Sequence, residues 1–172
     1  MHNKVVYRAT QALSRAGYAT LRFNFRGAGA SEGVHDHGRG EVDDLRAALD
    51  ETERRGGLPL LAGGFSFGAA VTLRAIDGDP RVKAYIGIGL PLASLSGRDL
   101  PPPRVPALFV SGGNDAFGPP AMLEQFVGGS GQIVVVPGAD HFLTGHLETM
   151  QDTVARFLEG LPAEQGARGA TA

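Results

Sequence analysis

Apolar residues along the chain follow two patterns, and each pattern predicts a different kind of element. Short apolar or aromatic runs are typical of strands, while apolar residues repeated every three or four positions are typical of amphipathic helices. The runs predict strands at Tyr18–Phe25, Leu58–Gly64, Val82–Leu90, Val105–Ser111 and Gln132–Val136. The helical spacing predicts helices from Asn3 to about Arg15 and at Glu41–Arg54, Ser66–Ile76, Pro119–Val127 and Thr144–Glu159.

Turn-forming residues mark the ends of several of these elements. Asn3 can cap the first helix through its side-chain oxygen, and Gly17 can end it. Pro119 or Pro120 suits the first turn of a helix, because the N–H that proline lacks would be unpaired there anyway. These signals support the predicted helix boundaries.

Predicted strands and helices alternate through the chain. This order indicates an α/β fold, a three-layer αβα sandwich with a mostly parallel sheet and helices on both faces. A length of 172 residues suggests one domain, which we place at residues 1–161. Residues 162–172 are mostly small and polar, so we expect a flexible C-terminal tail.

Composition narrows the class of protein further. The formal net charge of −2 gives no reason to expect nucleic acid or an anionic membrane as a partner. The chain has no cysteine, which excludes disulfides and thiolate chemistry and fits a reducing compartment. No apolar run approaches the ~20 residues of a membrane span, and no segment has the pattern of a secretory signal. We therefore expect a soluble, cytoplasmic protein.

The most informative stretch is Gly64-Phe65-Ser66-Phe67-Gly68, which has the pattern G-x-S-x-G between a predicted strand and a predicted helix. A serine in that position sits in a tight, strained turn that pushes its hydroxyl outward, and the glycines let neighbouring backbone pass close by. The start of the helix adds unpaired backbone N–H groups that favour the oxyanion formed in acyl transfer. The stretch predicts a nucleophile elbow, with the Phe67 N–H as an oxyanion donor.

Two further polar residues follow later strands at short distance. The carboxyl ends of parallel strands meet at one edge of a sheet, so Ser66, Asp115 and His141 are expected to converge there. Their order, Ser then Asp then His, is that of an esterase-type catalytic triad. His141 would take the proton of Ser66 and return it to the leaving group, while Asp115 would orient His141.

Each of these assignments has a rival nearby in the sequence. Asp140 is the rival of Asp115, but it adjoins His141, and a neighbour on an extended loop tends to point the other way. His146 is the rival of His141, but the helical spacing places it inside the last helix.

Two other motifs suggest ligands that we do not expect. His35 and His37 flank Asp36, but the loop has no further cluster of metal-binding side chains, so no metal is predicted and we expect a polar loop near the mouth of the cleft. Gly27-x-Gly29 follows a predicted strand, but the next helix starts too late for a dinucleotide loop. No cofactor is predicted.

The chain resembles the α/β-hydrolase superfamily, and within it small bacterial lidless serine hydrolases related to dienelactone hydrolases and carboxylesterases. The resemblance covers Asn3 to about Leu161 and implies a serine hydrolase with no cofactor. A serine at the elbow departs from dienelactone hydrolases, which use cysteine. The motifs that carry the resemblance are Leu21-Arg22-Phe23-Asn24-Phe25-Arg26-Gly27-x-Gly29-x-Ser31, Gly64-Phe65-Ser66-Phe67-Gly68, Gly112-Gly113-x-Asp115 and Gly138-Ala139-Asp140-His141-Phe142.

The resemblance also implies strands ahead of the first helix, which this sequence does not contain. One of them would lie between the strands matching Tyr18–Phe25 and Leu58–Gly64, and its loop would supply the second oxyanion donor. Without that strand, its two neighbours would lie about 9–10 Å apart, which is twice the usual spacing between paired strands. We expect the native chain to start upstream of Met1; re-pairing of the sheet and a strand from another chain are the alternatives.

The leading hypothesis is a serine hydrolase that cleaves small carboxylic esters or thioesters through an acyl-enzyme. The segment Leu92–Arg104 offers little material for a lid, so we expect an open cleft and small substrates. The alternative is a non-catalytic α/β-hydrolase-like binding or scaffold protein, and a nucleotide-binding protein is a more distant one. The sequence leaves the acyl group, the leaving group and the oligomeric state, including a homo-oligomer, undetermined.

Overall fold

The computed structural model describes residues 3–56, 59–95 and 100–162. Five α-helices, four β-strands and one 3₁₀ turn follow one another in these ranges. The elements are α1 (Lys4–Arg15), α2 (Gly40–Arg54), β1 (Leu60–Phe65), α3 (Phe67–Ile76), β2 (Val82–Ile88), η1 (Leu92–Ser94), β3 (Ala107–Gly112), α4 (Pro120–Val127), β4 (Gln132–Val136) and α5 (Leu147–Glu159).

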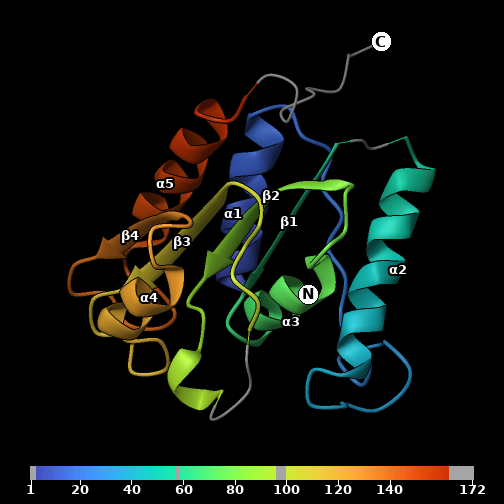
Figure 1. Cartoon of the computed structure of the whole chain (residues 1–172), viewed down its shortest axis with the longest axis horizontal. Coiled ribbons are helices and arrows are strands. Elements are labelled where there is room, and N and C mark those ends of the chain that lie inside the picture. The colour runs from blue at the N-terminus through green and yellow to red at the C-terminus, as the bar shows by residue number, and fades with distance from the viewer. Residues whose placement is uncertain (1–2, 57–58, 96–99, 163–172) are drawn as a thin grey trace.

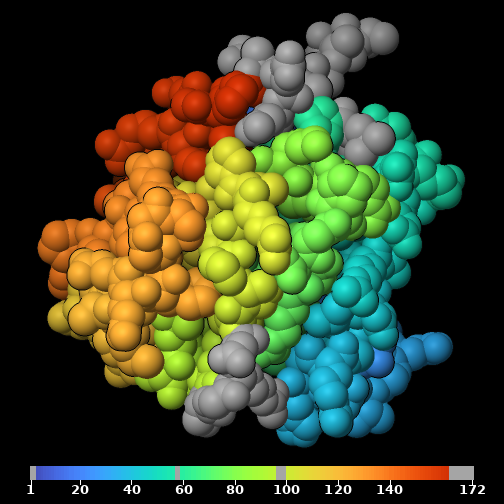
Figure 2. All heavy atoms as spheres, viewed as in Figure 1, coloured from blue at the N-terminus to red at the C-terminus, as the bar shows by residue number. Residues whose placement is uncertain are grey.

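The four strands form one parallel sheet in the order β1-β2-β3-β4. Helices α1 and α5 pack together on one face, and α2, α3 and α4 cover the other (Figure 1). With all atoms drawn in the same view, the helices and connecting segments of the near side hide the strands (Figure 2). The predicted three-layer α/β architecture is confirmed.

Alternate residues of the central strands feed two separate cores. On β2, Tyr85 joins the core under α3 and α4, while Ile86 and Ile88 join the core under α1 and α5. The Tyr85 hydroxyl donates a hydrogen bond to the carbonyl of Ala69 at 3.0 Å. Burial raises the pKa of Tyr85, so the phenol stays a donor. Side chains buried on both sides of the sheet account for the uninterrupted apolar runs in the sequence.

Most of the predicted elements occur, with boundaries displaced by a few residues. The largest displacement is at the last helix, which begins at Leu147 and not at Thr144. Residues 140–146 form turns instead, because Asp140 accepts hydrogen bonds from the backbone and hydroxyl of Thr144. The prediction that His146 lies inside the helix was therefore wrong, since His146 is the residue that precedes it. The predicted flexible tail, residues 162–172, lies outside the described ranges except for Pro162.

The predicted strand at Tyr18–Phe25 was also wrong, because none of its residues lies in the sheet. A strand requires a hydrogen-bonded neighbour at about 4.8 Å, and in the described chain β1 is paired on one side only, with β2. The aromatic residues of this segment still pack on the core, with the Phe25 ring 5.1 Å from the Phe23 ring and 5.9 Å from the Phe67 ring. The apolar pattern therefore marks a segment whose aromatic side chains are partly buried against the core, and not a paired strand.

No helix in the described ranges is both long and apolar enough to cross a bilayer. The carboxyl ends of the strands point toward the lower part of Figure 1, where the start of α3 and the loop that precedes α2 also lie. This edge collects the polar residues that the sequence singles out.

The first helix offers a direct test of the predicted cap. The Asn3 side-chain oxygen accepts hydrogen bonds from the backbone N–H groups of Val5 and Val6 at 2.9 and 3.1 Å. Asn3→Ala should lower the free energy of unfolding by about 1 kcal/mol, because both N–H groups lose their acceptor. Urea unfolding measures this, with Asn3→Asp as the control that keeps a capping oxygen. An Asn3→Ala variant as stable as the Asp variant would contradict the role of the cap.

Candidate active site

Ser66 occupies a strained turn between β1 and α3. Its backbone angles are φ 53° and ψ −123°, a region that residues with a side chain rarely adopt. The Ser66 N–H donates to the carbonyl of Ile88 at 2.9 Å, which fixes the turn to the end of β2. The sheet therefore holds the serine in a conformation that it would not adopt alone.

The two glycines of the G-x-S-x-G stretch have different roles. A Cβ on Gly64 would lie 2.4 Å from the Gly68 carbonyl carbon, so the close approach of strand and helix requires glycine at 64. A Cβ on Gly68 would meet only the Phe25 ring, at 3.7 Å, which is an ordinary contact. The sequence pattern treats these positions alike, whereas the backbone requires only the first.

Asp115 lies in the turn after β3 and is almost completely buried. Its Oδ1 accepts hydrogen bonds from the backbone N–H groups of Phe117 and Gly118 at 2.9 and 3.0 Å. Its Oδ2 lies 2.8 Å from His141 Nδ1. Backbone donors thus orient the carboxylate so that its second oxygen faces the imidazole.

His141 follows β4 and connects the other two side chains. Its Nδ1 contacts Asp115, and its Nε2 lies 2.9 Å from Ser66 Oγ. Because the carboxylate oxygen accepts, it favours the tautomer with the proton on Nδ1, and Nε2 can then accept from the serine hydroxyl. The imidazole is 7% exposed, so few water molecules compete for these contacts.

The loops after β3 and β4 approach each other closely enough to bring Asp115 and His141 together. A Cβ on Gly112 would lie 2.4 Å from the carbonyl oxygens of Ala139 and Asp140. Only glycine at 112 leaves room for this contact, and sequence reasoning gave it no such role.

The rivals named from the sequence have other partners. Both oxygens of Asp140 accept from Thr144, and these hydrogen bonds hold the pKa of Asp140 below its usual value. His146 donates its backbone N–H to Leu143 at the start of α5. The structure therefore brings Ser66, His141 and Asp115 into one hydrogen-bonded series and gives Asp140 a structural part.

Phe67 is the first residue of α3, so its N–H has no acceptor one turn back in the helix. This N–H follows directly on Ser66, at the positive end of the helix dipole. The N–H is therefore left without a partner inside the helix, next to the Ser66 hydroxyl-bearing turn.

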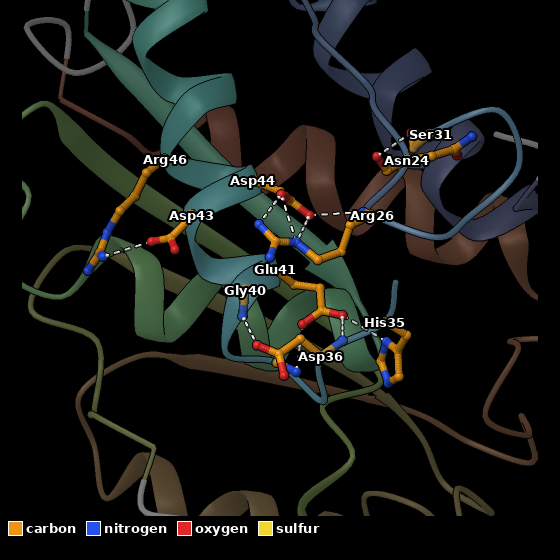
Figure 3. Close-up of polar contacts among 11 residues, drawn as sticks. Asn24, Arg26, Ser31, His35, Asp36, Gly40, Glu41, Asp43, Asp44 and Arg46 are labelled. Atoms are coloured by element: carbon orange, nitrogen blue, oxygen red, sulfur yellow. Dashed lines mark hydrogen bonds and ion pairs between the residues drawn. The ribbon is translucent and has the colours of Figure 1, made fainter. Parts of the chain in front are cut away.

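The loop between residues 26 and 39 packs against Phe67 and is organised by a buried carboxylate. Glu41, in the first turn of α2, is fully buried and accepts from the backbone N–H groups of Asp36 and Gly38 at 2.8 and 2.7 Å. Its Oε1 also lies 2.8 Å from His35 Nδ1 (Figure 3). The His35 ring in turn lies 5.2 Å from the Phe67 ring. In the sequence, Glu41 marks only the start of a predicted helix, and its burial depends on contacts that spacing does not record.

Electrostatics in this loop favour charged carboxylates. Burial alone would raise the pKa of Glu41, but the hydrogen bonds from Asp36, Gly38 and its own N–H hold it below the usual value. Arg26 binds both carboxylate oxygens of Asp44 and lowers the pKa of that group, which ties the start of the loop to α2 (Figure 3). The loop is therefore fixed at both ends.

The described residues include no group of three or more His, Cys, Asp or Glu side chains placed to hold a metal ion. Two hollows, of about 320 and 330 Å³, lie away from Ser66. One is lined by the Asp77–Val82 turn and Pro102–Pro106, and the other lies between α1 and α5. We assign the reactive site from the side-chain geometry, since neither hollow includes Ser66 or His141.

The different roles of the two motif glycines can be tested directly. Gly64→Ala should lower the free energy of unfolding by about 1–3 kcal/mol, because the new Cβ meets helix backbone that cannot yield without moving Ser66. Gly68→Ala should unfold at the same or slightly higher urea concentration, because alanine favours the helix. Urea unfolding of both variants checks this. Equal destabilisation by the two substitutions would refute the assignment.

The buried carboxylate predicts a pH-dependent contribution to stability. Glu41→Gln should lower the free energy of unfolding at pH 7 by about 1–3 kcal/mol, because one N–H then faces an amide NH₂. The folded pKa of Glu41 is lowered, so its stabilisation is present above the unfolded pKa and is lost as pH falls through the folded pKa.

Urea unfolding at a series of pH values, from pH 7 down through the folded pKa of Glu41, measures the effect. The difference in the free energy of unfolding between wild type and Glu41→Gln should shrink as the pH falls. The exposed Glu124 provides the matched control, since Glu124→Gln should change stability little at any pH. A difference independent of pH would mean that the charge of Glu41 does not carry the effect.

Comparisons with known proteins identify the family of the chain. The family model Hydrolase_4, described as "Serine aminopeptidase, S33", matches residues 1–103, which include Ser66. An uncharacterized protein of Rickettsia prowazekii is 33% identical over 171 residues, which cover 92% of this chain and 72% of the relative.

Two solved structures are also similar. An α/β serine hydrolase homologue from Coxiella burnetii is 34% identical with a TM-score of 0.83, over 91% of this chain and 76% of the other. An α/β serine hydrolase without lid from Xanthomonas campestris is 34% identical with a TM-score of 0.84, and the match covers 92% of this chain and 74% of the other. The chain therefore belongs to this family of serine hydrolases, within the α/β-hydrolase superfamily.

Proposed function

We propose that the protein hydrolyses small carboxylic esters or thioesters through a covalent acyl-enzyme on Ser66. The observation that carries the proposal is the hydrogen-bonded series from Asp115 through His141 to Ser66, with separations of 2.8 and 2.9 Å. Nucleophile and base lie within hydrogen-bond reach, and a third group orients the base, which is the arrangement that acyl transfer by serine requires.

Acylation begins when Ser66 Oγ attacks the carbonyl carbon of the ester. The hydroxyl proton passes to His141 Nε2 as the new C–O bond forms, and Asp115 stabilises the resulting imidazolium. The tetrahedral intermediate then collapses, the bond to the alcohol or thiol breaks, and His141 returns the proton to that leaving group. The products of this half are an acyl-serine and a free alcohol or thiol.

Deacylation repeats the sequence with water as the nucleophile. His141 Nε2 takes a proton from the water as its oxygen attacks the acyl carbon, and the proton then goes to Ser66 Oγ as the acyl–serine bond breaks. The carboxylic acid leaves and the hydroxyl of Ser66 is restored. None of these steps calls for a cofactor.

The Phe67 N–H supplies one fixed donor to the oxygen that becomes negative in both halves. A donor of this kind is worth roughly 10²–10³ in rate, because its dipole is already oriented when the charge develops. The strained backbone of Ser66 supports this role, since it presents Oγ and the following N–H at the same edge of the sheet.

The surroundings of Ser66 favour small substrates and an open approach. In the described part of the connection from β2 to β3, the one regular element is the short turn η1. The similar hydrolase from Xanthomonas campestris is described as lacking a lid. We take the partner to be a small-molecule ester or thioester, with the acyl group to be found by experiment.

Covalent labelling tests the proposal. A fluorophosphonate probe should label the wild-type protein at Ser66, because His141 activates that hydroxyl, and Ser66→Ala should not be labelled. Ser130→Ala is the matched control, since the Ser130 hydroxyl donates to the carbonyl of Val127 after α4 and its loss should leave labelling intact. Ester hydrolysis by Ser66→Ala should fall by about 10⁴-fold or more.

Substrate panels then define the reaction. 4-Nitrophenyl esters of graded acyl length and one thioester should be hydrolysed, with the shorter acyl groups preferred. Aminoacyl anilides belong in the panel because the matching family model is described as a serine aminopeptidase. A folded protein that is neither labelled nor active on any of these compounds would support the alternative of a binding or scaffold protein.

A further inference from the structure

Two phenylalanine rings lie against the His141 imidazole and are open to solvent. The Phe117 ring centroid is 4.7 Å from the imidazole centroid, and that of Phe142 is 5.3 Å away. The two residues are 50% and 57% exposed. A large apolar ring left in water forgoes the free energy that its burial would gain, so exposed rings beside a reactive group indicate contact with a ligand.

Both rings are held in place by fixed backbone. The Phe117 N–H donates to Asp115 Oδ1, and its carbonyl accepts from the Ala93 N–H in η1 at 2.9 Å. These two hydrogen bonds tie Phe117 to Asp115 and to the turn η1. The exposure of Phe117 therefore does not come from a loose segment.

Phe142 is fixed by the turn that follows His141. The next residue, Leu143, is 1% exposed and has φ 54°, a backbone conformation unusual for leucine. The Leu143 N–H donates to the carbonyl of Asp140 at 3.1 Å, which closes the turn. The turn thus buries Leu143 and leaves Phe142 at the surface, next to the Phe65 ring at 5.8 Å.

The direction of proton transfer decides which part of a substrate meets these rings. The leaving group receives its proton from His141 Nε2, so its oxygen or sulfur must lie within hydrogen-bond reach of that atom. The Phe117 and Phe142 rings lie within 5.3 Å of the imidazole, so the atoms beyond the leaving oxygen or sulfur can reach them. The acyl carbon and its oxygen lie instead toward Ser66 Oγ and the Phe67 N–H.

We infer that Phe117 and Phe142 form a subsite for an aromatic or bulky apolar leaving group, such as a benzyl or phenolic alcohol. This inference rests on the proposed function and adds the class of leaving group to it. Aromatic rings prefer offset or edge-to-face contact with centroids about 4.5–7 Å apart, and such a pair stabilises binding beyond the area that it buries. Phe117 and Phe142 are then specificity-determining residues, and the chemistry stays with Ser66, His141 and Asp115.

The test compares two esters that differ only in the leaving group. Benzyl acetate and ethyl acetate share the acyl group and release alcohols of similar acidity, so the ratio of their kcat/KM values reports recognition of the alcohol. The wild type should prefer benzyl acetate. Phe142→Ala and Phe117→Ala should each lower that ratio by about tenfold, which is the loss expected when one aromatic contact disappears.

A matched control and a second series separate recognition from structural damage. Tyr7→Ala removes an equally exposed ring from α1, 47% exposed, and should leave the ratio unchanged. In a series of ethyl esters from acetate to hexanoate, the preference for acyl length should be the same in the wild type and in Phe142→Ala. Benzyl alcohol should slow fluorophosphonate labelling of Ser66 in the wild type more than in either phenylalanine variant.

The outcomes distinguish this inference from the proposed function. If the variants lose activity on benzyl and ethyl acetate in equal proportion, the rings act only on the site's structure and the inference is overturned while the esterase stands. A changed acyl-length preference would place the rings on the acyl side and also overturn it. A wild type that hydrolyses no ester overturns the proposed function, and this inference with it.

Discussion

The contact between the buried carboxylate of Asp115 and His141 Nδ1 is the interaction on which the site depends. It fixes the tautomer and the direction of the imidazole, and only in that direction does Nε2 reach Ser66 Oγ. The carboxylate is itself fixed by backbone N–H groups from Phe117 and Gly118. The orientation of the imidazole that contacts Ser66 is thus decided by the turn that follows β3.

The rest of the structure keeps this series of contacts under constraint. Ser66 has an unfavourable backbone conformation, Gly64 lies against the backbone of α3, and Gly112 lies against the loop that carries His141. The backbone strain at Ser66 costs of order 1–3 kcal/mol and persists only when the surroundings overdetermine it. Here the two cores on either face of the sheet fix the strand ends, so the loops have little freedom to relax.

The two sides of the site differ in chemistry. On the side of His141, the rings of Phe117 and Phe142 are exposed around the group that would protonate a leaving group. On the side of Phe67, a buried Glu41 fixes the loop that carries His35 over the ring next to the oxyanion donor. The first side thus exposes aromatic surface, whereas the carboxylate on the second is fully buried and acts through the loop that it orders.

The sequence by itself determined the alternation of strands and helices from Leu60 onward, the Asn3 cap, the turn at Ser66 and the set of three polar residues at strand ends. These features depend on neighbours in the chain or on burial, which composition and spacing record directly. Tertiary structure decided the pairing of strands, so the apolar segment Tyr18–Phe25 packs on the core but joins no sheet. It also decided which glycine of the motif is required, and that Glu41 is buried and Phe117 and Phe142 are exposed, because each depends on contacts between segments far apart in the chain.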